Sequence, residues 1–478
     1  MSNITKGFIW KFFERLSVQG SQFIIQIILA RLLSPEHYGA LAIMMIFISL
    51  ANVVIQNGFN TSLIQNKDVD DDDFSSVFWI ILGISLLVYM SLYVVAPLLA
   101  DYYGMPYLEN PFKVICLMLI PGALNSVQLA IIRRSMDFKK EFTTNLISIV
   151  LAGVIGIICA YRGLGLWSLV VQTLLNTSIA CITMWYVLGW RPRYVFNPSR
   201  VKVLFAYGYK LVLAGLLDTL SSNLSAFVIG AKYSSASLGY YARGNQFPAA
   251  LMGAINSAVQ SVMLPALSII QDNKKEFKLL MRKSITLSCY VVFLLMTILA
   301  GIAKPMVSLV LTDKWLPCVP YIQIFCFTYA FWPVHTNNLQ AINALGRSDI
   351  FLKLEVIKKI IGLAAIAFAV YYYDDPISIA GIGIVTAITS SFINCYPNKY
   401  LLDYSYFEQM KDILPYFILA LSTYFIEVLI VTYTDNNITS MILAIIGGTL
   451  FYVIVSYLSK LEAYMFIYEK ITALMKGK

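Results

Sequence analysis

Apolar runs recur along the whole chain and are separated by short polar connections. A helix needs roughly 20 apolar residues to cross the hydrocarbon core of a bilayer, which is about 30 Å thick. Because backbone groups in lipid must be hydrogen-bonded within their own segment, each such run predicts a membrane-spanning helix. The fourteen runs lie near residues 8–33, 38–65, 74–99, 111–132, 142–161, 165–189, 201–230, 237–268, 284–311, 318–345, 350–373, 377–402, 412–433 and 438–459. The pattern therefore predicts an all-α integral membrane protein.

The first apolar run carries a stripe of polar side chains, which we call the first stripe. Its members are Lys11, Arg15, Gln19, Gln22 and Gln26. At about 100° per residue, they fall within about 80° of arc on one helical face. The seventh run carries a similar second stripe, with alanine in the position of the arginine: Lys210, Ala214, Asp218, Ser221 and Ser225. Two such faces predict a polar cavity shared by the two helices.

The chain also contains an internal duplication. The pairs that match after the first and seventh runs are Ser34 with Ser234 and Gly39 with Gly239. In the fourth and tenth runs, the set Pro121, Asn125, Gln128 and Asp137 matches Pro333, Asn337, Gln340 and Asp349 at the same spacings. Two matching stretches in the same order predict two repeats of six helices, at residues 1–200 and 201–403. Because six is an even number, both repeats run in the same direction and are related by an axis along the membrane normal.

Two further helices and an amphipathic cytoplasmic tail, residues 404–478, follow the repeats. Pro121 and Pro333 stand about midway along the fourth helix of each repeat, where a proline can kink the helix. Transporters built from such repeats hold a substrate between them and expose it alternately to either side of the membrane. The organisation therefore predicts a transporter.

Composition and charge agree with a membrane protein. Hydrophobic residues make up 59% of the chain and charged residues 13%, far from the balance of soluble domains. Lys and Arg alternate between the two sides of the membrane in a way that predicts cytoplasmic positions for both termini. The same distribution over short connections accounts for the net charge of +9 without a nucleic-acid partner.

Neither the cysteines nor the acidic residues predict a metal site or a cofactor. The seven cysteines form no metal-ligand spacing, which indicates packing residues. The acidic run at residues 67–73, KDVDDDD, has two interpretations. One is a metal-binding site of a glycosyltransferase, and the other, which we favour, is a solvated turn in which Asp72 or Asp73 caps a helix that begins near Phe74.

Ionisable residues inside the predicted helices indicate where a substrate binds, because they are costly in lipid and usually face the bundle interior. The acidic members are Glu14, Asp218, Glu355 and Glu427. Cationic members predominate, which favours an anionic substrate such as a diphosphate, and Arg15 and Arg243 offer bidentate contacts to it. The candidate substrate-binding residues are Lys11, Arg15, Gln19, Gln22, Gln26, Arg31, Lys210, Asp218 and Arg243.

Several of these side chains have an alternative interpretation. Lys11 and Arg15 lie near the cytoplasmic end of their helix and can extend to the membrane interface. Glu14 can pair with Lys11 or serve, like Asp218, as a site for a coupling ion. Arg243 lies near the outer surface and can be interfacial as well.

Four sequence stretches carry a family resemblance. They are RLLSPEHYGALAI after the first run, LAIIRRSMDFKK after the fourth, ASLGYYARGNQF at the start of the eighth and INALGRSD after the tenth. Together with the arrangement of two six-helix repeats followed by two further helices, these stretches make the chain resemble the Wzx-type polysaccharide flippases. These belong to the multidrug/oligosaccharidyl-lipid/polysaccharide exporter superfamily, whose fold is that of the MATE and MurJ proteins. The branch it resembles includes colanic and teichuronic acid exporters.

The resemblance implies a bacterial inner-membrane flippase and not an enzyme. Its substrate would be an undecaprenyl-diphosphate-linked oligosaccharide, moved from the cytoplasmic to the periplasmic leaflet for the synthesis of O-antigen, capsule or exopolysaccharide. A polysaccharide polymerase and a chain-length regulator are the implied partners, beside the lipid bilayer. The cationic cavity of the family would correspond to Arg15, Arg31 and Arg243 of this chain.

Two alternatives stay open. One is an ion-coupled multidrug exporter of the same superfamily, for which a mainly acidic cavity is expected. The other is a membrane glycosyltransferase or polysaccharide polymerase, for which a catalytic constellation on a large loop outside the membrane is expected.

Overall fold

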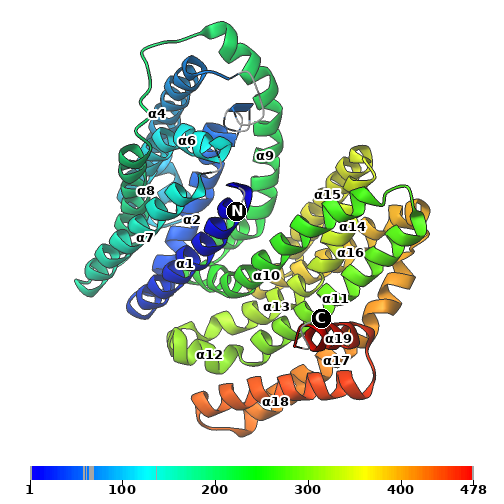
Figure 1. The fold of residues 1–478 in the computed structure, drawn as a ribbon. Helices are drawn as coiled ribbons and strands as arrows, with labels where there is room; N and C mark the ends of the chain where they lie inside the picture. Colours follow the sequence, from blue (N-terminus) through cyan, green and yellow to red (C-terminus); the bar gives the residue numbers. More distant parts are fainter. Residues whose placement is uncertain (1–2, 58–59, 61, 64–68, 136, 476–478) are drawn as a thin grey trace. The chain divides into compact units, whose positions relative to one another are not determined.

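The computed structural model describes residues 3–57, 60, 62–63, 69–135 and 137–475, and every regular element within them is helical (Figure 1). The chain divides into two compact units, Met1–Gly239 and Tyr240–Lys478. The first unit and the helix that continues into the second comprise α1 (Asn3–Leu32), α2 (Pro35–Asn52), η1 (Val53–Asn57), α4 (Asp71–Tyr102), η2 (Pro106–Leu108), α5 (Glu109–Ile115), η3 (Cys116–Met118), α6 (Leu119–Ser135), α7 (Phe138–Tyr161), α8 (Leu166–Leu188), α9 (Pro198–Lys232) and α10 (Ser235–Ile269).

The second unit contains the rest of α10 and nine further elements. They are α11 (Lys274–Gly301), α12 (Ala303–Val310), η4 (Asp313–Cys318), α13 (Val319–Ala330), α14 (Trp332–Ala344), α15 (Ser348–Tyr372), α16 (Pro376–Leu402), α17 (Tyr406–Tyr433), α18 (Asn437–Leu458) and the short C-terminal α19 (Glu462–Met475). Helix α11 packs against α17, α13 and α14, and α17 packs against α18. The helix pair α17 and α18 therefore packs against α11 within this unit.

The prediction of an all-α integral membrane protein is confirmed. Within the described residues, each of the fourteen apolar runs corresponds to one helix or to two or three consecutive helical segments. Among the described residues, 11 helices are long and apolar enough to cross a membrane. The predicted spans beyond these correspond to α1, which carries the first stripe, to the broken pair α13 and α14, and to α15, whose first turns are charged.

The two repeated prolines lie where their helices are interrupted. Pro121 is in the first turn of α6, directly after the 3₁₀ segment η3. Pro333 is in the first turn of α14, directly after the break at Phe331 that separates α13 from α14. Proline has no backbone N–H and cannot donate the hydrogen bond that a residue inside a helix makes. In the first turn of a helix the N–H groups have no partner within the helix, so proline is tolerated there. The helices predicted to kink at these prolines are interrupted next to them.

The acidic run starts helix α4, but Asp70 caps it and not Asp72 or Asp73. The Asp70 carboxylate accepts hydrogen bonds from the backbone N–H groups of Asp72 and Asp73 at 3.1 and 2.9 Å. The helix begins before Phe74 because carboxylates are favourable in the first turn of a helix, where the backbone N–H groups have no acceptor within the helix. Residues 67–68 of the run lie outside the described residues.

The cytoplasmic ends predicted for three helices of the second unit are joined by a buried amide network. It consists of Asn338 on α14, Asn398 on α16 and Gln409 on α17, all 0% exposed. Asn398 Nδ2 and Gln409 Nε2 donate to Asn338 Oδ1 at 2.6 and 3.1 Å, and Asn338 Nδ2 donates to Gln409 Oε1 at 2.8 Å. Such reciprocal bonds hold helices in one register where side chains are removed from water.

The boundary between the two units differs in position from the boundary of the sequence repeats. By contacts the division falls inside α10, between Gly239 and Tyr240. Helix α9 belongs to the first unit, in which it packs against α2, η1 and α4. The boundaries at residues 200 and 403 rest on sequence repetition and stay a prediction.

Candidate functional site

The first stripe lies on α1, which packs against α7 (Figure 1). Ile25 forms part of the buried side of α1 and contacts Gly153 of α7, where a larger residue would collide with it. Gln19 and Gln22 are exposed, and Gln26 is half-buried. The side chains of Lys11, Glu14 and Arg15 lie outside the described residues. The described part of the stripe is thus accessible from outside the protein, and Arg31 at the last turn of α1 is exposed too.

The second stripe lies on α9 of the same unit. Lys210 and Asp218 are exposed, and the Lys210 ammonium lies 5.9 Å from the centre of the Tyr209 ring. Ser221 donates to the Leu217 carbonyl of its own helix at 2.6 Å. Helix α9 packs against α2 and α4, whereas α1 packs against α7. Both stripes therefore belong to the first unit, and their participation in one cavity stays a prediction.

The polar turn η1 at the end of α2 was not predicted from the sequence. Helix α2 ends in the π-helical segment η1, which packs against α9. Across the junction of α2 and η1, Gln56 Nε2 donates to Asn52 Oδ1 at 3.1 Å, and the Gln56 amide lies near Gly122 of α6. π-Helical turns within α-helices are frequent at functional sites. The signal that could have revealed it is the pair of amides one turn apart in an otherwise apolar run.

Arg243 lies in the second unit and is only 4% exposed. Its guanidinium donates to the Gln246 side chain one turn later on α10, and its central carbon lies 5.7 Å from the centre of the Trp315 ring. The neighbouring Gly244 lies against Tyr321, and a β-carbon there would collide with it. A guanidinium over an aromatic face is stabilised when water is excluded. The structure thus gives Arg243 a packing contact, and its binding of a diphosphate stays a prediction.

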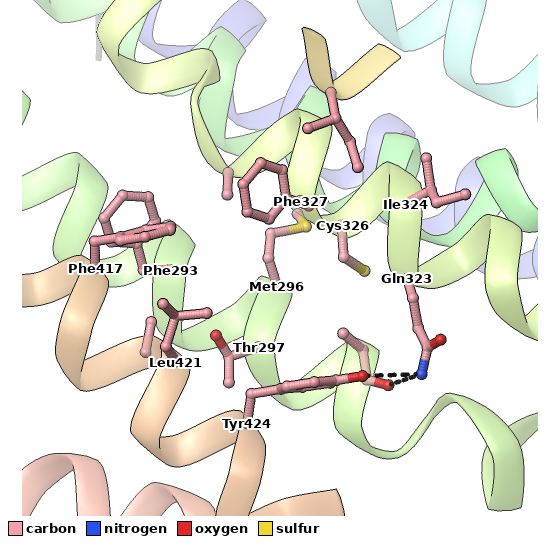
Figure 2. Close-up of a pocket in the computed structure, with 14 residues that line it drawn as sticks. Phe293, Met296, Thr297, Gln323, Ile324, Cys326, Phe327, Phe417, Leu421 and Tyr424 are labelled. Atoms are coloured by element: carbon pink, nitrogen blue, oxygen red, sulfur yellow. Dashed lines mark hydrogen bonds between the residues drawn. The ribbon is translucent and has the colours of Figure 1, made fainter. Parts of the chain in front are cut away.

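The second unit contains an apolar cavity of about 300 Å³ between α11, α13, α16 and α17. Figure 2 shows Phe293, Met296 and Phe327 around it, with Thr297, Gln323 and Tyr424 among its polar members. Gln323 Nε2 donates to the Tyr424 hydroxyl at 3.2 Å and to the Ala300 carbonyl at 3.4 Å. The lining can accept an apolar group and offers one hydrogen-bonded pair of polar side chains.

A second, more polar pocket of about 260 Å³ lies between α13, α14, α15 and α16. His335 and Lys358 line it together with Trp332 and Ser390. The Lys358 ammonium donates to Glu355 at 2.5 Å on the same helix. Among the described residues, His, Cys, Asp and Glu form no group of three that could hold a metal ion.

Comparisons with known proteins agree with this architecture. A family model described as polysaccharide biosynthesis protein matches residues 28–320. The succinoglycan biosynthesis transport protein ExoT of Rhizobium meliloti is 22% identical over 76% of this chain and 74% of its own length. The lipopolysaccharide biosynthesis protein WzxC of Escherichia coli is 21% identical over 75% of this chain and 73% of its own length. The resemblance to Wzx-type proteins is thereby confirmed.

A solved structure of the lipid II flippase MurJ, in an inward closed conformation, has the same fold. Its TM-score is 0.74, with 14% sequence identity, and the match covers 95% of this chain and 99% of that one. At this identity the likeness concerns the fold alone. The family model spans more than half of the sequence, and the chain is a multi-pass membrane protein that belongs to the polysaccharide biosynthesis protein family.

Proposed function

We propose that this chain is a flippase that moves an undecaprenyl-diphosphate-linked oligosaccharide from the cytoplasmic to the periplasmic leaflet of the bacterial inner membrane. The observation that carries the proposal is the MurJ-like fold along 95% of the chain, combined with a family match to polysaccharide biosynthesis proteins. The product would be a surface polysaccharide such as O-antigen, capsule or exopolysaccharide. A polymerase and a chain-length regulator would use the lipid-linked units after transfer.

The first stripe is the proposed contact surface for the diphosphate and the sugars. Gln19 and Gln22 are exposed on α1, and amides can donate to and accept from sugar hydroxyls. Lys11 and Arg15, on the same helical face, would replace the water that the phosphates lose on entering the membrane. The second stripe, with Lys210 and without a counterpart of Arg15, would contribute less positive charge. We therefore expect the diphosphate at the first stripe.

Transport would follow the alternating-access scheme. The repeats at residues 1–200 and 201–403 would rock against each other and expose the polar surface first to one side of the membrane and then to the other. The lipid tail would stay in the bilayer, so only the polar head has to cross. No covalent bond of the substrate changes in this cycle, and the chain would act as a transporter and not as an enzyme, with both termini in the cytoplasm.

The proposal is tested in a bacterial host whose surface polysaccharide depends on this chain. Arg15→Ala and Gln22→Ala should reduce surface polysaccharide and cause lipid-linked oligosaccharide to accumulate on the cytoplasmic leaflet, whereas Arg15→Lys should retain part of the export. Lys411→Ala, which removes an exposed cation at the start of α17, serves as the matched control. Normal polysaccharide with Arg15→Ala and Gln22→Ala at normal protein levels would exclude the first stripe as the binding surface.

The same host separates the alternatives. If deletion of the chain leaves the polysaccharide intact but increases sensitivity to cationic drugs, the multidrug exporter is correct. If deletion abolishes synthesis of the lipid-linked oligosaccharide itself, instead of trapping it on the cytoplasmic leaflet, a glycosyltransferase is correct.

A further inference from the structure

Glu427 is a carboxylic acid in the middle of the helix core of the second unit. It lies on α17, which packs against α11 and α18, and it is 0% exposed. Neither of its carboxyl oxygens has a hydrogen-bond partner among the described residues. Buried carboxyl groups in membrane helices normally pair with a cation or a donor. An acid without such a partner needs a physical explanation.

Two glycines on the neighbouring helices form a socket around this acid. Gly301 is the last residue of α11, and a β-carbon at that position would collide with one carboxyl oxygen of Glu427. Gly448 lies on α18, and a β-carbon there would collide with the other oxygen. Only glycine leaves this space on both helices, so the two neighbours are shaped to receive the carboxyl group. A side chain that was buried by accident would not require a glycine on each side.

The socket is suited to a neutral carboxylic acid. A carboxylate in an apolar surrounding loses its hydration, and this loss is costly unless a cation or several donors replace the water. The carboxyl group lies against Gly301 of α11 and Gly448 of α18, and neither carries a charge or a polar side chain. On its own helix, the titratable neighbour is Tyr424, one turn earlier.

The apolar cavity of this unit is lined by residues of the same two helices, α11 and α17, close in sequence to Gly301 and Glu427. Ala300, the residue before Gly301, lines the cavity, and so does Tyr424 (Figure 2). Gln323 donates to the Tyr424 hydroxyl at 3.2 Å, and a hydroxyl that accepts such a bond can still donate its own proton. A hydroxyl and a water molecule in such a cavity can pass a proton between the carboxyl group and the solvent.

We propose that Glu427 is a proton-binding site of the transport cycle. In the conformation of this structure the carboxyl group holds its proton, and it releases the proton to water when α11, α17 and α18 separate enough to hydrate it. The O–H bond of the acid breaks, water accepts the proton, and the carboxylate stays hydrated until the helices close again. That this proton drives transport rests on the proposed function, whereas the occupied proton site does not.

The proton site is tested by infrared spectroscopy on the full chain in phospholipid vesicles. A protonated carboxylic acid has a C=O band that shifts in deuterated water, and the wild-type chain should show such a band that Glu427→Gln lacks. Glu427→Asp should restore a displaced band. Glu469→Gln, the same change at an exposed position on α19, should leave the band unaltered. The proposal would be overturned if the wild-type chain and Glu427→Gln had the same spectrum in this region. If Glu427→Gln does not fold, the comparison is made with Glu427→Asp, and an identical spectrum would again overturn the proposal.

The role in transport is tested in the polysaccharide-dependent host. Glu427→Gln should reduce export by about tenfold, within the usual range of coupling between sites, and should make the remaining export insensitive to a protonophore. Glu427→Asp should keep protonophore sensitivity. Export by Glu427→Gln with unchanged rate and sensitivity would overturn the coupling. If the wild-type chain supports no export while the infrared band is present, the proposed function fails and the proton site stands.

Discussion

Gly39 and Gly239 pack against the starts of each other's helices. A β-carbon at Gly39 of α2 would collide with the carbonyl oxygen of Ser235, and one at Gly239 of α10 would collide with the carbonyl oxygen of Pro35. Pro35 and Ser235 are corresponding positions of the two predicted repeats, as are the two glycines. The contact is therefore reciprocal. The sequence match of these glycines has a structural cause, which is the close approach of two backbones.

Replacing either glycine should destabilise the protein. In Gly39→Ala or Gly239→Ala, the added methyl group meets backbone atoms, which can move only together with their helix. Overpacking of this kind costs about 1–3 kcal/mol. The melting temperature of the detergent-solubilised chain should fall for both variants.

Gly253→Ala is the matched control for this prediction. Gly253 lies within α10, and a β-carbon there has nothing within 4 Å. Because alanine is a better helix former than glycine, the melting temperature of Gly253→Ala should equal that of the wild-type chain or exceed it. Equal melting temperatures for Gly39→Ala and Gly253→Ala would show that the two helix starts are not in close contact in solution.

The start of α17 is held by a buried carboxylate with two partners. Asp412 accepts from the Arg282 guanidinium and from the Tyr404 hydroxyl, both at 2.7 Å, and its side chain is 7% exposed. Asp412→Asn keeps the shape but removes the charge and one acceptor, so we expect a loss of about 1–3 kcal/mol in the free energy of unfolding. Chemical unfolding monitored by circular dichroism measures this loss.

A neighbouring ion pair provides the comparison for Asp412→Asn. Glu408 binds Lys278 at 2.9 Å, but its side chain is 38% exposed. Water screens such a pair, so Glu408→Gln should cost less than about 1 kcal/mol. The interpretation of Asp412 as a buried link between α11 and α17 would be wrong if both variants lost the same amount.

Tyr404 makes the stability of this region depend on pH. Burial, together with the hydrogen bond to Asp412, raises the pKa of the Tyr404 phenol above its ordinary value of 10.0. The folded state thus favours the protonated phenol, and its contribution is fully present below about pH 10 and is lost as the pH rises further. Tyr404→Phe should flatten the fall in melting temperature above this pH. Tyr400→Phe, which removes an exposed phenol, is the control. If the melting temperature falls with pH equally steeply in Tyr404→Phe and Tyr400→Phe, Tyr404 is not the source of the pH dependence.

The helices could be predicted from the sequence, because they depend on patterns local to the chain. The runs of apolar residues give fourteen segments, and the helices of the structure coincide with them. The interruptions at Pro121 and Pro333 follow from the chemistry of proline itself. The acidic cap at Asp70 was placed two or three residues too late, because several aspartates in a row satisfy the same preference for a helix start.

The partners of individual polar side chains could not be predicted, because they lie on helices far apart in the sequence. Nothing around Asn338 indicates that Asn398 and Gln409 will meet it. Glu427 was recognisable as an acid within an apolar run, but its socket depends on glycines of two other helices. A single sequence contains the periodicity of each helix and not the pairing between helices.

Arg243 provides the last test, because sequence and structure suggest different roles for it. The sequence favours contact with a diphosphate, whereas the structure places its guanidinium over Trp315 at 5.7 Å in a buried position. If packing is its role, Arg243→Ala loses a cation–π contact of about 2 kcal/mol, and both the melting temperature and the export fall. Arg31→Ala, which removes an exposed arginine at the end of α1, should leave the melting temperature nearly unchanged. Loss of export by Arg243→Ala with an unchanged melting temperature would instead support direct contact with the substrate.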